Sequence, residues 1–343
     1  MYTNQTATEL ELFRCTSSGI LEAMNSIWIK INFFLSTSII LLTFFASIYA
    51  VRVLKFHNVY SSGTQFLLFS LLISVNFNQM VYLVIQVRLQ IQIWKYSDDP
   101  CQIEFPSTEC YYDNSLYMFT SYLVTWLVFS LTFDRNRIFF LKIFQSFFSC
   151  FNKLSLKYYT FQLIFTFIGH ILVYGGVSRA GYVPTCQYPP QLALGAFQKM
   201  THLKIVFTIL NCVVILILLC FIVKRDRRIC HSIYDTNTRY SSFENVLTTK
   251  SILVIAVTHL IFSCLSSVAV TIARAFEIGL SEYTFHTMTQ FIAGPLYGNL
   301  SIPVLIYRKT SQCIEYRRKT IIKLTTQADE VDSRMMSLKK MWE

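Results

Sequence analysis

The 343-residue chain is 53% hydrophobic and 16% aromatic, and only 14% of its residues are charged. Charged residues make up about a quarter of ordinary soluble domains, so this composition excludes a typical soluble protein and indicates a chain that lies largely in lipid. The formal net charge is +11. A basic surface beside anionic membrane lipid accounts for this charge, so no nucleic-acid partner is expected.

Seven segments of about 20 residues contain few or no charged side chains, and this is the length that crosses a hydrocarbon core as a helix. The segments lack the polar stripe that a surface helix of a soluble fold would show. We therefore predict an all-α membrane protein, a seven-transmembrane helix bundle that fills residues 29–307 as a single membrane domain. The predicted helices cover residues 31–51, 66–87, 112–133, 158–177, 205–223, 251–273 and 285–307.

The distribution of Lys and Arg predicts the orientation of this bundle, because basic segments tend to remain on the cytoplasmic side. With the amino terminus outside, the inner segments carry 22 of the 30 Lys and Arg residues. These inner segments are residues 52–63, 134–157, 224–250 and 308–343. Residues 1–28 then form an extracellular amino-terminal segment. Residues 308–343 form a basic cytoplasmic tail, which places the carboxyl terminus inside.

Four of the ten cysteines fall on the predicted outer side, where the environment permits disulfides. They are Cys15, Cys101, Cys110 and Cys186, and they allow three pairings. A bond between Cys110, just outside the third helix, and Cys186, in the loop after the fourth, would tie that loop over the mouth of the bundle. Cys15 and Cys101 would then be the remaining pair.

Two positions are candidates for covalent modification. Asn4 begins a glycosylation sequon on the predicted outer side, whereas the same pattern at Asn299 lies inside the seventh helix, where it could not be used. Cys313 stands among basic residues just after the seventh helix and is a candidate for palmitoylation. The alternative is an unmodified thiol in a basic amphipathic segment that lies on the inner leaflet.

The helix interiors contain no Asp, Glu, Lys or Arg. A charge at mid-helix costs about 2.5 to 3.5 kcal/mol and usually marks an ion or proton pathway. Its absence argues against a pump, a proton-coupled transporter, a charge-lined pore and an intramembrane enzyme. His170 and His259 are isolated, so we expect packed hydrogen-bonding residues there, with no metal site and no cofactor.

Uncharged polar residues within the helices have two interpretations. Asn76, Asn78, Gln79, Asn211 and Gln290 are of the type that forms hydrogen bonds between helices in lipid, and this structural role is the default expectation. Those in the outer halves could instead line an apolar, aromatic cavity suited to a small, weakly polar ligand. The candidate ligand-binding residues are Asn78, Gln79, Tyr117, Tyr122, His286 and Gln290.

Asp134 and Arg135 follow Cys110 by 24 residues, a separation of roughly 36 Å along a helix, which matches a membrane and its edges. Seven helices, an outside amino terminus, this cysteine with a partner in the next outer loop, and the acid-base pair together resemble the rhodopsin-like G-protein-coupled receptors. Within that group the chain is most similar to the nematode serpentine chemoreceptors of class alpha. The similar stretches are "FRCTSSGILEAMNSIWIKIN", "LTFDRNR", "YVPTCQYPPQ" and "GPLYGNLSIPVLIYRK".

This resemblance implies a chemosensory receptor in the plasma membrane of sensory neurons, which binds a small molecule or peptide outside and activates a heterotrimeric G protein inside. It also implies that Asp134 holds Arg135 at rest and releases it on activation. Asn136 departs from the aromatic residue that usually follows this pair, so the pairing at the helix foot is expected to differ in detail. The alternatives are a seven-helix ligand-gated cation channel subunit, with an inside amino terminus in the insect type, and a non-signalling membrane scaffold.

Overall fold

The computed structural model describes residues 15–57, 59–140, 160, 164, 166–168, 170–171, 174–175, 180–188, 206, 209–211, 213–217, 220–221, 224, 248–262, 281–291 and 294–342. About half of the residues of the predicted helices at 158–177 and 205–223 lie outside this part of the chain, as does the glycosylation candidate Asn4.

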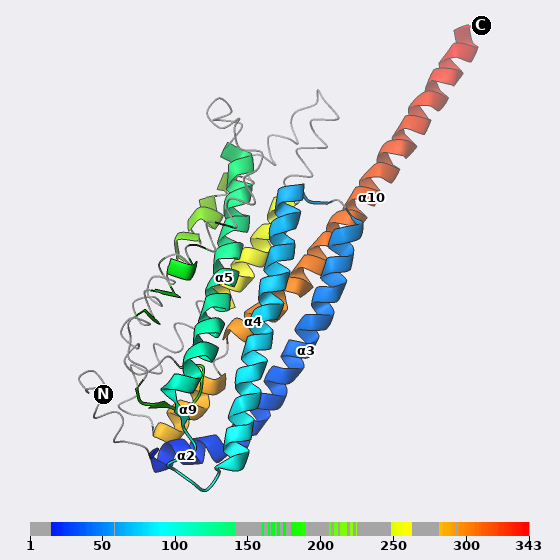
Figure 1. Ribbon diagram of the computed structural model, residues 1–343. Helices are drawn as coiled ribbons and strands as arrows, with labels where there is room; N and C mark the ends of the chain where they lie inside the picture. Colours follow the sequence, from blue (N-terminus) through cyan, green and yellow to red (C-terminus); the bar gives the residue numbers. More distant parts are fainter. Residues whose placement is uncertain are drawn as a thin grey trace.

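Three long helices run side by side: α3 (Ile27–Phe56), α4 (Ser62–Lys95) and α5 (Ser107–Phe140) (Figure 1). Among the described residues, three helices are long and apolar enough to cross a membrane, and they are α3, α4 and the Ser107–Thr132 part of α5. These helices contain the predicted segments 31–51, 66–87 and 112–133. Their outward-facing side chains include large apolar groups such as Phe34 and Ile73, each 70% exposed. Such surfaces suit contact with lipid rather than water.

The carboxyl-terminal part of the chain forms α9 (Glu282–Phe291) and α10 (Gly294–Trp342). The predicted seventh helix at 285–307 is therefore divided between two helices, with Pro295 in the first turn of α10. Proline is tolerated there because the first-turn N–H groups have no partner within the helix. The predicted tail does not begin as a separate element, because α10 continues through it and leaves the bundle as a long single helix (Figure 1).

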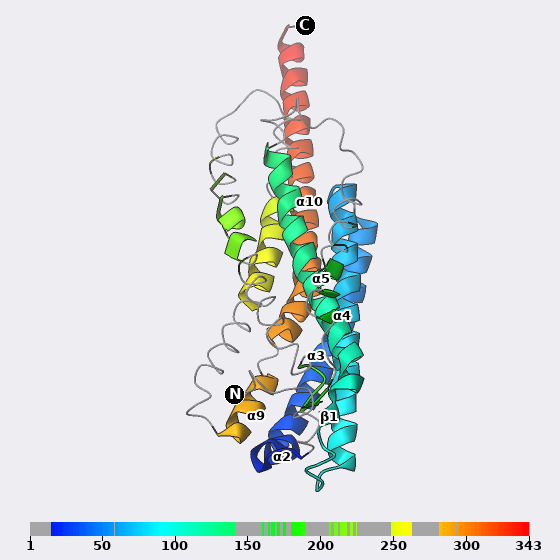
Figure 2. The ribbon, with the colours of Figure 1, turned by 60° about the vertical axis from the view of Figure 1, so that its left-hand side comes forward.

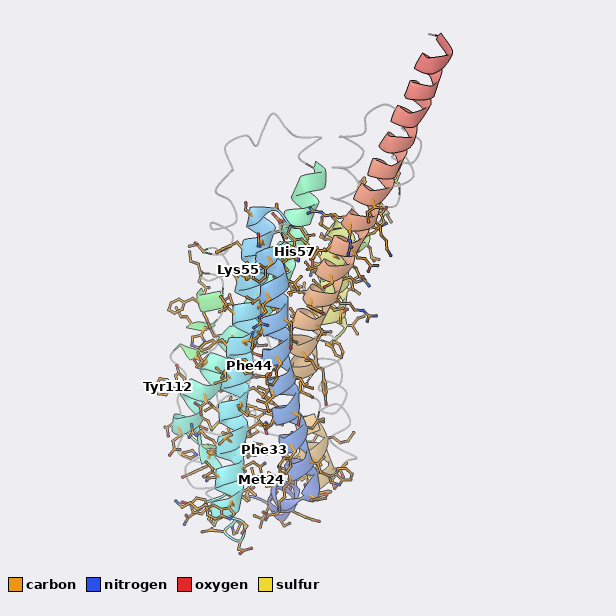
Figure 3. The ribbon with its side chains drawn as sticks, turned by 90° about the vertical axis from the view of Figure 1, so that its right-hand side faces the viewer. Met24, Phe33, Phe44, Lys55, His57 and Tyr112 are labelled. Atoms are coloured by element: carbon orange, nitrogen blue, oxygen red, sulfur yellow. A yellow bond between two sulfur atoms is a disulfide. The ribbon has the colours of Figure 1, made fainter. Side chains whose placement is uncertain are left out.

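The two ends of the bundle differ in their chemistry. Met24 and Phe33 lie toward the end that carries the disulfides, whereas Lys55 and His57 lie at the opposite end (Figure 3). We call these the disulfide end and the Asp134 end. Buried apolar side chains fill the interior, with Ile85, Leu89 and Ile103 packed at the disulfide end and Leu67, Leu71, Leu127 and Leu131 at the Asp134 end.

A short helix, α2 (Ser18–Asn25), closes the disulfide end and packs against α9 (Figure 2). Ser17 caps α2, because its hydroxyl accepts a hydrogen bond from the Ile20 N–H at 3.3 Å and also donates to the Glu282 carboxylate of α9. Gly19 permits the close approach of the two helices. A Cβ at residue 19 would lie 2.9 Å from the Cβ of Glu282, which is shorter than the distances that Cβ atoms keep from neighbouring heavy atoms in proteins.

Candidate functional site

Two disulfides and a two-stranded sheet cover the disulfide end. The strands β1 (Phe105–Pro106) and β2 (Tyr182–Val183) pair antiparallel, with Phe105 opposite Val183. Disulfides join Cys110 to Cys186 and Cys15 to Cys101. This is the pairing that would tie the loop after the fourth predicted helix over the mouth of the bundle.

The loop between α4 and α5 holds a half-buried carboxylate, Glu104. Burial raises the pKa of Glu104, and the hydrogen bond that its Oε1 accepts from the Thr16 hydroxyl at 3.0 Å partly offsets this effect. The backbone N–H of Thr16 also donates to the Pro100 carbonyl at 2.7 Å, so the amino-terminal segment is attached to this loop beside its disulfide.

Gln187, which directly follows Cys186, is held in place by α5. The fully buried Asn114 donates from Nδ2 to the Gln187 carbonyl at 2.6 Å, and the Tyr174 hydroxyl donates to Asn114 Oδ1. The disulfide and this hydrogen bond fix the backbone of Gln187 at two neighbouring residues. The Gln187 side chain is therefore held in a defined position at the disulfide end of the helices.

That place is a buried polar cluster of four side chains, which we call the Tyr82 cluster: Ser36 of α3, Tyr82 and Gln86 of α4, and Gln187. The side chains of Ser36, Gln86 and Gln187 lie close to the Tyr82 hydroxyl. Within the described part of the chain, however, none of these contacts has full hydrogen-bond geometry, so Ser36 Oγ, Tyr82 Oη and the two amide nitrogens lie near one another without a well-aligned partner. A buried polar group without a partner costs about 1–3 kcal/mol, so native proteins rarely bury several together without a function.

Two aromatic residues lie beside this cluster. The ring of Tyr117 on α5 lies 5.9 Å from that of Tyr82 between centroids, and Tyr297 of α10 lies near enough to Tyr82 to interact with it electrostatically. Four polar groups beside two tyrosine rings resemble the polar anchors of a small-molecule site, which is otherwise mostly apolar. Of the predicted ligand-binding residues, Tyr117 therefore lies beside this cluster.

Asn78 and Gln79 have structural partners instead. Asn78 Nδ2 donates to Thr120 Oγ1 of α5 at 2.7 Å, and Asn78 Oδ1 accepts from Asn299 Nδ2 of α10 at 2.8 Å. Gln79 Nε2 donates to the Leu296 carbonyl of α10 at 3.2 Å, and both side chains are at most 2% exposed. Their geometry matches the default expectation of hydrogen bonds between helices and argues against the predicted ligand contacts.

The other predicted ligand residues are placed as follows. Tyr122 is buried on α5, and the His286 ring packs edge-on against Phe285 on α9 with centroids 5.5 Å apart. Gln290 also belongs to α9, but its side chain lies outside the described residues.

His170 has the packed, hydrogen-bonded environment expected for it, since its Nε2 lies 2.8 Å from Ser115 Oγ.

At the opposite end, Asp134 is joined to the foot of α4. The hydroxyl of Thr64, a fully buried residue, donates to Asp134 Oδ2 at 2.7 Å and lies 2.8 Å from the Ser61 hydroxyl. The side chain of Arg135 lies outside the described residues, so its pairing with Asp134 stays a prediction. Thr64 had no role in the sequence interpretation, because only the packing of α4 on α5 brings it to the acid.

Cys313 is not placed as a lipid-modified residue would be. Only 1% of it is exposed, and its Sγ lies 3.5 Å from the Ser251 hydroxyl of helix Thr248–Phe262. Burial raises the pKa of the thiol, and this outweighs the opposite effects of Ser251 and Lys309. Because palmitoylation needs an accessible thiolate, the structure favours the alternative of an unmodified thiol, although in a packed rather than a membrane-surface position.

Comparison with known proteins gives a consistent result over almost the whole chain. Residues 10–342 match the sequence model of the family described as "Serpentine type 7TM GPCR chemoreceptor Sra". Serpentine receptor class alpha-27 of Caenorhabditis elegans is 50% identical over 345 residues, which cover 100% of this chain and 99% of that protein. Class alpha-20 and class alpha-25 of the same organism are 31% and 33% identical, over 99% and 96% of this chain and 100% and 98% of theirs.

Proposed function

Because this chain belongs to the Sra family of serpentine seven-transmembrane chemoreceptors, we propose that it binds a small ligand at the disulfide end and activates a heterotrimeric G protein at the Asp134 end. The family is one of receptors and not of enzymes, and it makes the chain a multi-pass membrane protein. The proposal places the amino terminus outside the plasma membrane of a sensory neuron.

The observation that carries the ligand-binding part is the Tyr82 cluster beneath the disulfide-tied loop. Tyr82 and Ser36 offer hydroxyl donors, while Gln86 and Gln187 offer amide N–H donors with no partner in the described part of the chain. Donors that converge in this way suit an acceptor oxygen on the ligand. Since no Lys or Arg belongs to the cluster, the ligand is a neutral compound with a carbonyl or ether oxygen on an otherwise apolar body.

The coupling part of the proposal rests on hydrogen bonds that join α4 to α5 and α10 on the side of the Tyr82 cluster that faces the Asp134 end. The Asn78, Thr120 and Asn299 side chains connect α4, α5 and α10 about one helical turn from the Tyr82 cluster, on the side toward Asp134. A ligand that binds one arrangement of these helices more tightly shifts the equilibrium toward it. In the resting arrangement Thr64 and Asp134 hold α4 to α5, and activation frees Arg135 for the G protein.

The ligand site is tested by screening neutral ketones, esters and aldehydes on cells that express the chain, with calcium imaging in the presence and absence of a G-protein inhibitor. For any active compound, Tyr82→Phe and Gln187→Ala should raise the half-maximal concentration by about tenfold, the effect of one lost hydrogen bond of about 1.4 kcal/mol. Tyr112→Phe, at an exposed position of α5, is the matched control. Unchanged potency in both cluster variants would disprove this ligand site.

The coupling part is tested with Arg135→Ala, which should abolish ligand-evoked G-protein activation at normal surface expression. Full activation by that variant would contradict the role proposed for Arg135. An epitope at the amino terminus should be stained on cells that have not been permeabilised. Staining only after permeabilisation, together with ionic currents that need no G protein, would instead favour a channel subunit.

A further inference from the structure

A groove beside α3 and α4 opens on the exposed surface of the bundle, in the half toward the Asp134 end. We call it the α3–α4 groove. Its volume is about 560 Å³. Figure 3 shows Phe44 nearer the middle of the bundle and Lys55 near the Asp134 end. The lining includes Phe44, Ile48, Val51, Arg52 and Lys55 along α3 and Asn76 of α4.

A hydrogen bond between the two helices fixes the floor of the groove. Asn76 Nδ2 donates to Ser47 Oγ at 2.9 Å and to the Leu72 carbonyl of its own helix at 2.7 Å, so this amide holds α4 against α3. Ser47 also lines the groove and is 5% exposed, whereas Ile48 and Val51 beside it are 51% and 37% exposed. The groove is therefore formed by the packing of the protein itself, and a molecule that enters it need not order the helices.

The apolar part of the groove lies within the hydrocarbon layer. Leu41 is at the middle of the predicted span 31–51, and half of a hydrocarbon core is about 15 Å thick. At about 1.5 Å per residue, Phe44 lies roughly 4.5 Å and Val51 roughly 15 Å from that middle, so both are inside the leaflet at the Asp134 end. Only a molecule dissolved in the bilayer can reach these side chains.

Two cations follow at the level of the lipid headgroups. Arg52 and Lys55 lie about 1.5 Å and about 6 Å beyond the span along the helix, and the headgroup layer is roughly 5–8 Å deep on each side. Both are exposed, and among the residues that the structure describes neither has an ion pair or a side-chain hydrogen bond. The lining contains no acid, and Asp134 accepts a hydrogen bond from Thr64 instead. The open end of the groove is therefore positive and available to an anion.

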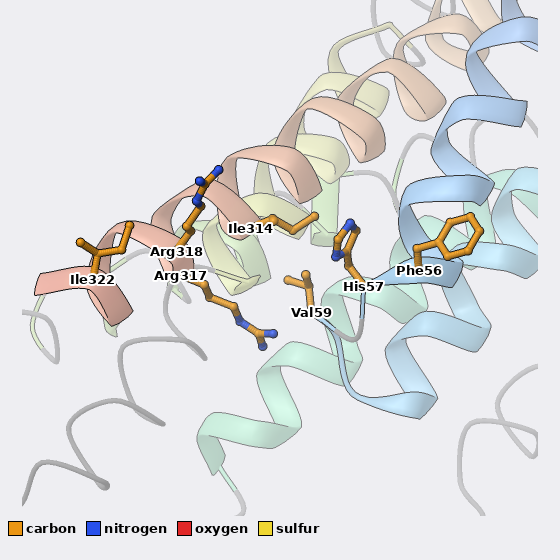
Figure 4. A pocket seen from close by; sticks show the side chains of 7 residues that line it. All are labelled: Phe56, His57, Val59, Ile314, Arg317, Arg318 and Ile322. Carbon is orange, nitrogen blue, oxygen red and sulfur yellow. The ribbon is translucent and has the colours of Figure 1, made fainter. Parts of the chain in front are cut away.

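Phe56 ends the groove on the side of the turn that joins α3 to α4. It also borders a second hollow of about 590 Å³ between this turn and α10, and Figure 4 shows the Phe56 ring turned away from Ile314 of α10. Phe56 is thus the boundary between the two hollows. The α3–α4 groove is complete without any residue of α10.

We propose that the α3–α4 groove binds one anionic phospholipid of the leaflet at the Asp134 end. One acyl chain lies along Phe44, Ile48 and Val51, and the phosphate lies at Arg52 and Lys55. A guanidinium offers a phosphate two parallel N–H donors, and the ammonium adds a second charge. A sterol would fill the apolar part but leave both cations without an anion, and a soluble phosphate could not use the apolar part. The inference goes beyond the proposed ligand and G-protein functions and depends on neither.

The test counts bound lipids on the full-length protein. The protein is equilibrated in nanodiscs with equal amounts of phosphatidylserine and phosphatidylcholine, extracted in mild detergent, and weighed by native mass spectrometry. Since both leaflets of the disc have the same composition, the result does not depend on orientation. The wild-type chain should retain one phosphatidylserine with a preference on the order of tenfold over phosphatidylcholine.

The charged part is tested by removing both cations. Arg52→Gln combined with Lys55→Gln should bring the preference close to parity, because only the net charge distinguishes the anionic lipid from the neutral one. Lys224→Gln combined with Arg318→Gln removes the same charge from exposed positions outside the groove and should change the preference by less than about twofold.

The apolar part is tested separately by filling it. Ile48→Trp places a larger side chain at an exposed position of the groove and keeps both cations, so it should lower the retention of phosphatidylserine several-fold. Phe45→Trp, at an exposed position of α3 outside the groove lining, is the matched control and should leave retention unchanged.

A wild-type chain without a preference for phosphatidylserine would overturn the proposal. An equal loss in the Arg52 and Lys55 variant and in its charge-matched control would also overturn it, because the attraction would then be diffuse. Retention that is equal in Ile48→Trp and Phe45→Trp would place the lipid elsewhere on the protein. Cholesterol that displaces phosphatidylserine from the wild type, when added to the discs in equal amount, would assign the groove to a sterol.

Discussion

Replacing Thr64 with valine tests the proposed resting contact at the Asp134 end. The substitution keeps the branched shape of a fully buried side chain but removes the hydroxyl that donates to Asp134 Oδ2 at 2.7 Å. A hydrogen bond to a charged group contributes about 1.5–3 kcal/mol. If the bond is made only at rest, losing about 2 kcal/mol shifts the equilibrium roughly 30-fold, so a receptor that is active about 1% of the time becomes active about 20% of the time.

The assay is ligand-free nucleotide exchange on the G protein, normalised to the amount of receptor at the cell surface. The matched control is Thr132→Val, two residues before Asp134 on α5. Its hydroxyl donates at 3.1 Å to the Val128 carbonyl of the same helix and so joins no second helix. Basal exchange should rise several-fold in Thr64→Val and stay unchanged in Thr132→Val. Wild-type basal exchange in Thr64→Val, or an equal rise in both variants, would refute the reasoning.

Three further predictions concern stability, measured as the thermal unfolding temperature of the purified receptor in detergent. Asn78→Leu removes the hydrogen bonds that join α4 to α5 and α10, each worth about 0.6–1.7 kcal/mol. This substitution should lower the unfolding temperature by several degrees. An unchanged unfolding temperature would mean that the junction does not form. Gly19→Ala should also lower the unfolding temperature, because the alanine Cβ would lie 2.9 Å from the Cβ of Glu282. This result is expected although alanine normally favours a helix. Ser18→Ala, at the neighbouring exposed position, should leave the unfolding temperature unchanged. Burial raises the pKa of Glu104 in the folded state, so protonation of this carboxylate favours folding. The stability of the wild type relative to Glu104→Gln should therefore rise as the pH falls from neutral to about 5. A stability difference that is independent of pH would contradict the burial of this carboxylate.

The class of fold could be predicted from composition because lipid leaves the chain few choices. A spanning segment must satisfy its own backbone hydrogen bonds, so an uncharged run of about 20 residues becomes a helix. The predicted segments at 31–51, 66–87 and 112–133 lie within α3, α4 and α5. The family match confirms the class alpha resemblance and the seven-helix membrane fold that it implied.

Hydropathy was less informative about where helices end. The prediction ended the seventh helix at residue 307 because the apolar run ends there, yet α10 continues to Trp342. Helical hydrogen bonds are local and form equally well in polar sequence, so the loss of hydrophobicity marks the edge of the membrane and not the end of a helix. The same reasoning missed the break between α9 and α10, where a new helix begins at Gly294 with Pro295 in its first turn.

The sequence alone determined that this protein crosses the membrane, which cysteines were available for disulfides, and to which receptor class it is related. Only the tertiary structure decided which polar residues meet. Asn78 and Tyr82 are one turn apart on α4, but Asn78 is paired with Thr120 and Asn299, whereas Tyr82 lies in a cluster completed by Gln187 from a loop. Periodicity tells which face of a helix is apolar, but it carries no information about the neighbour that will cover that face. That choice depends on how distant segments pack, and here a disulfide carries the deciding residue into place.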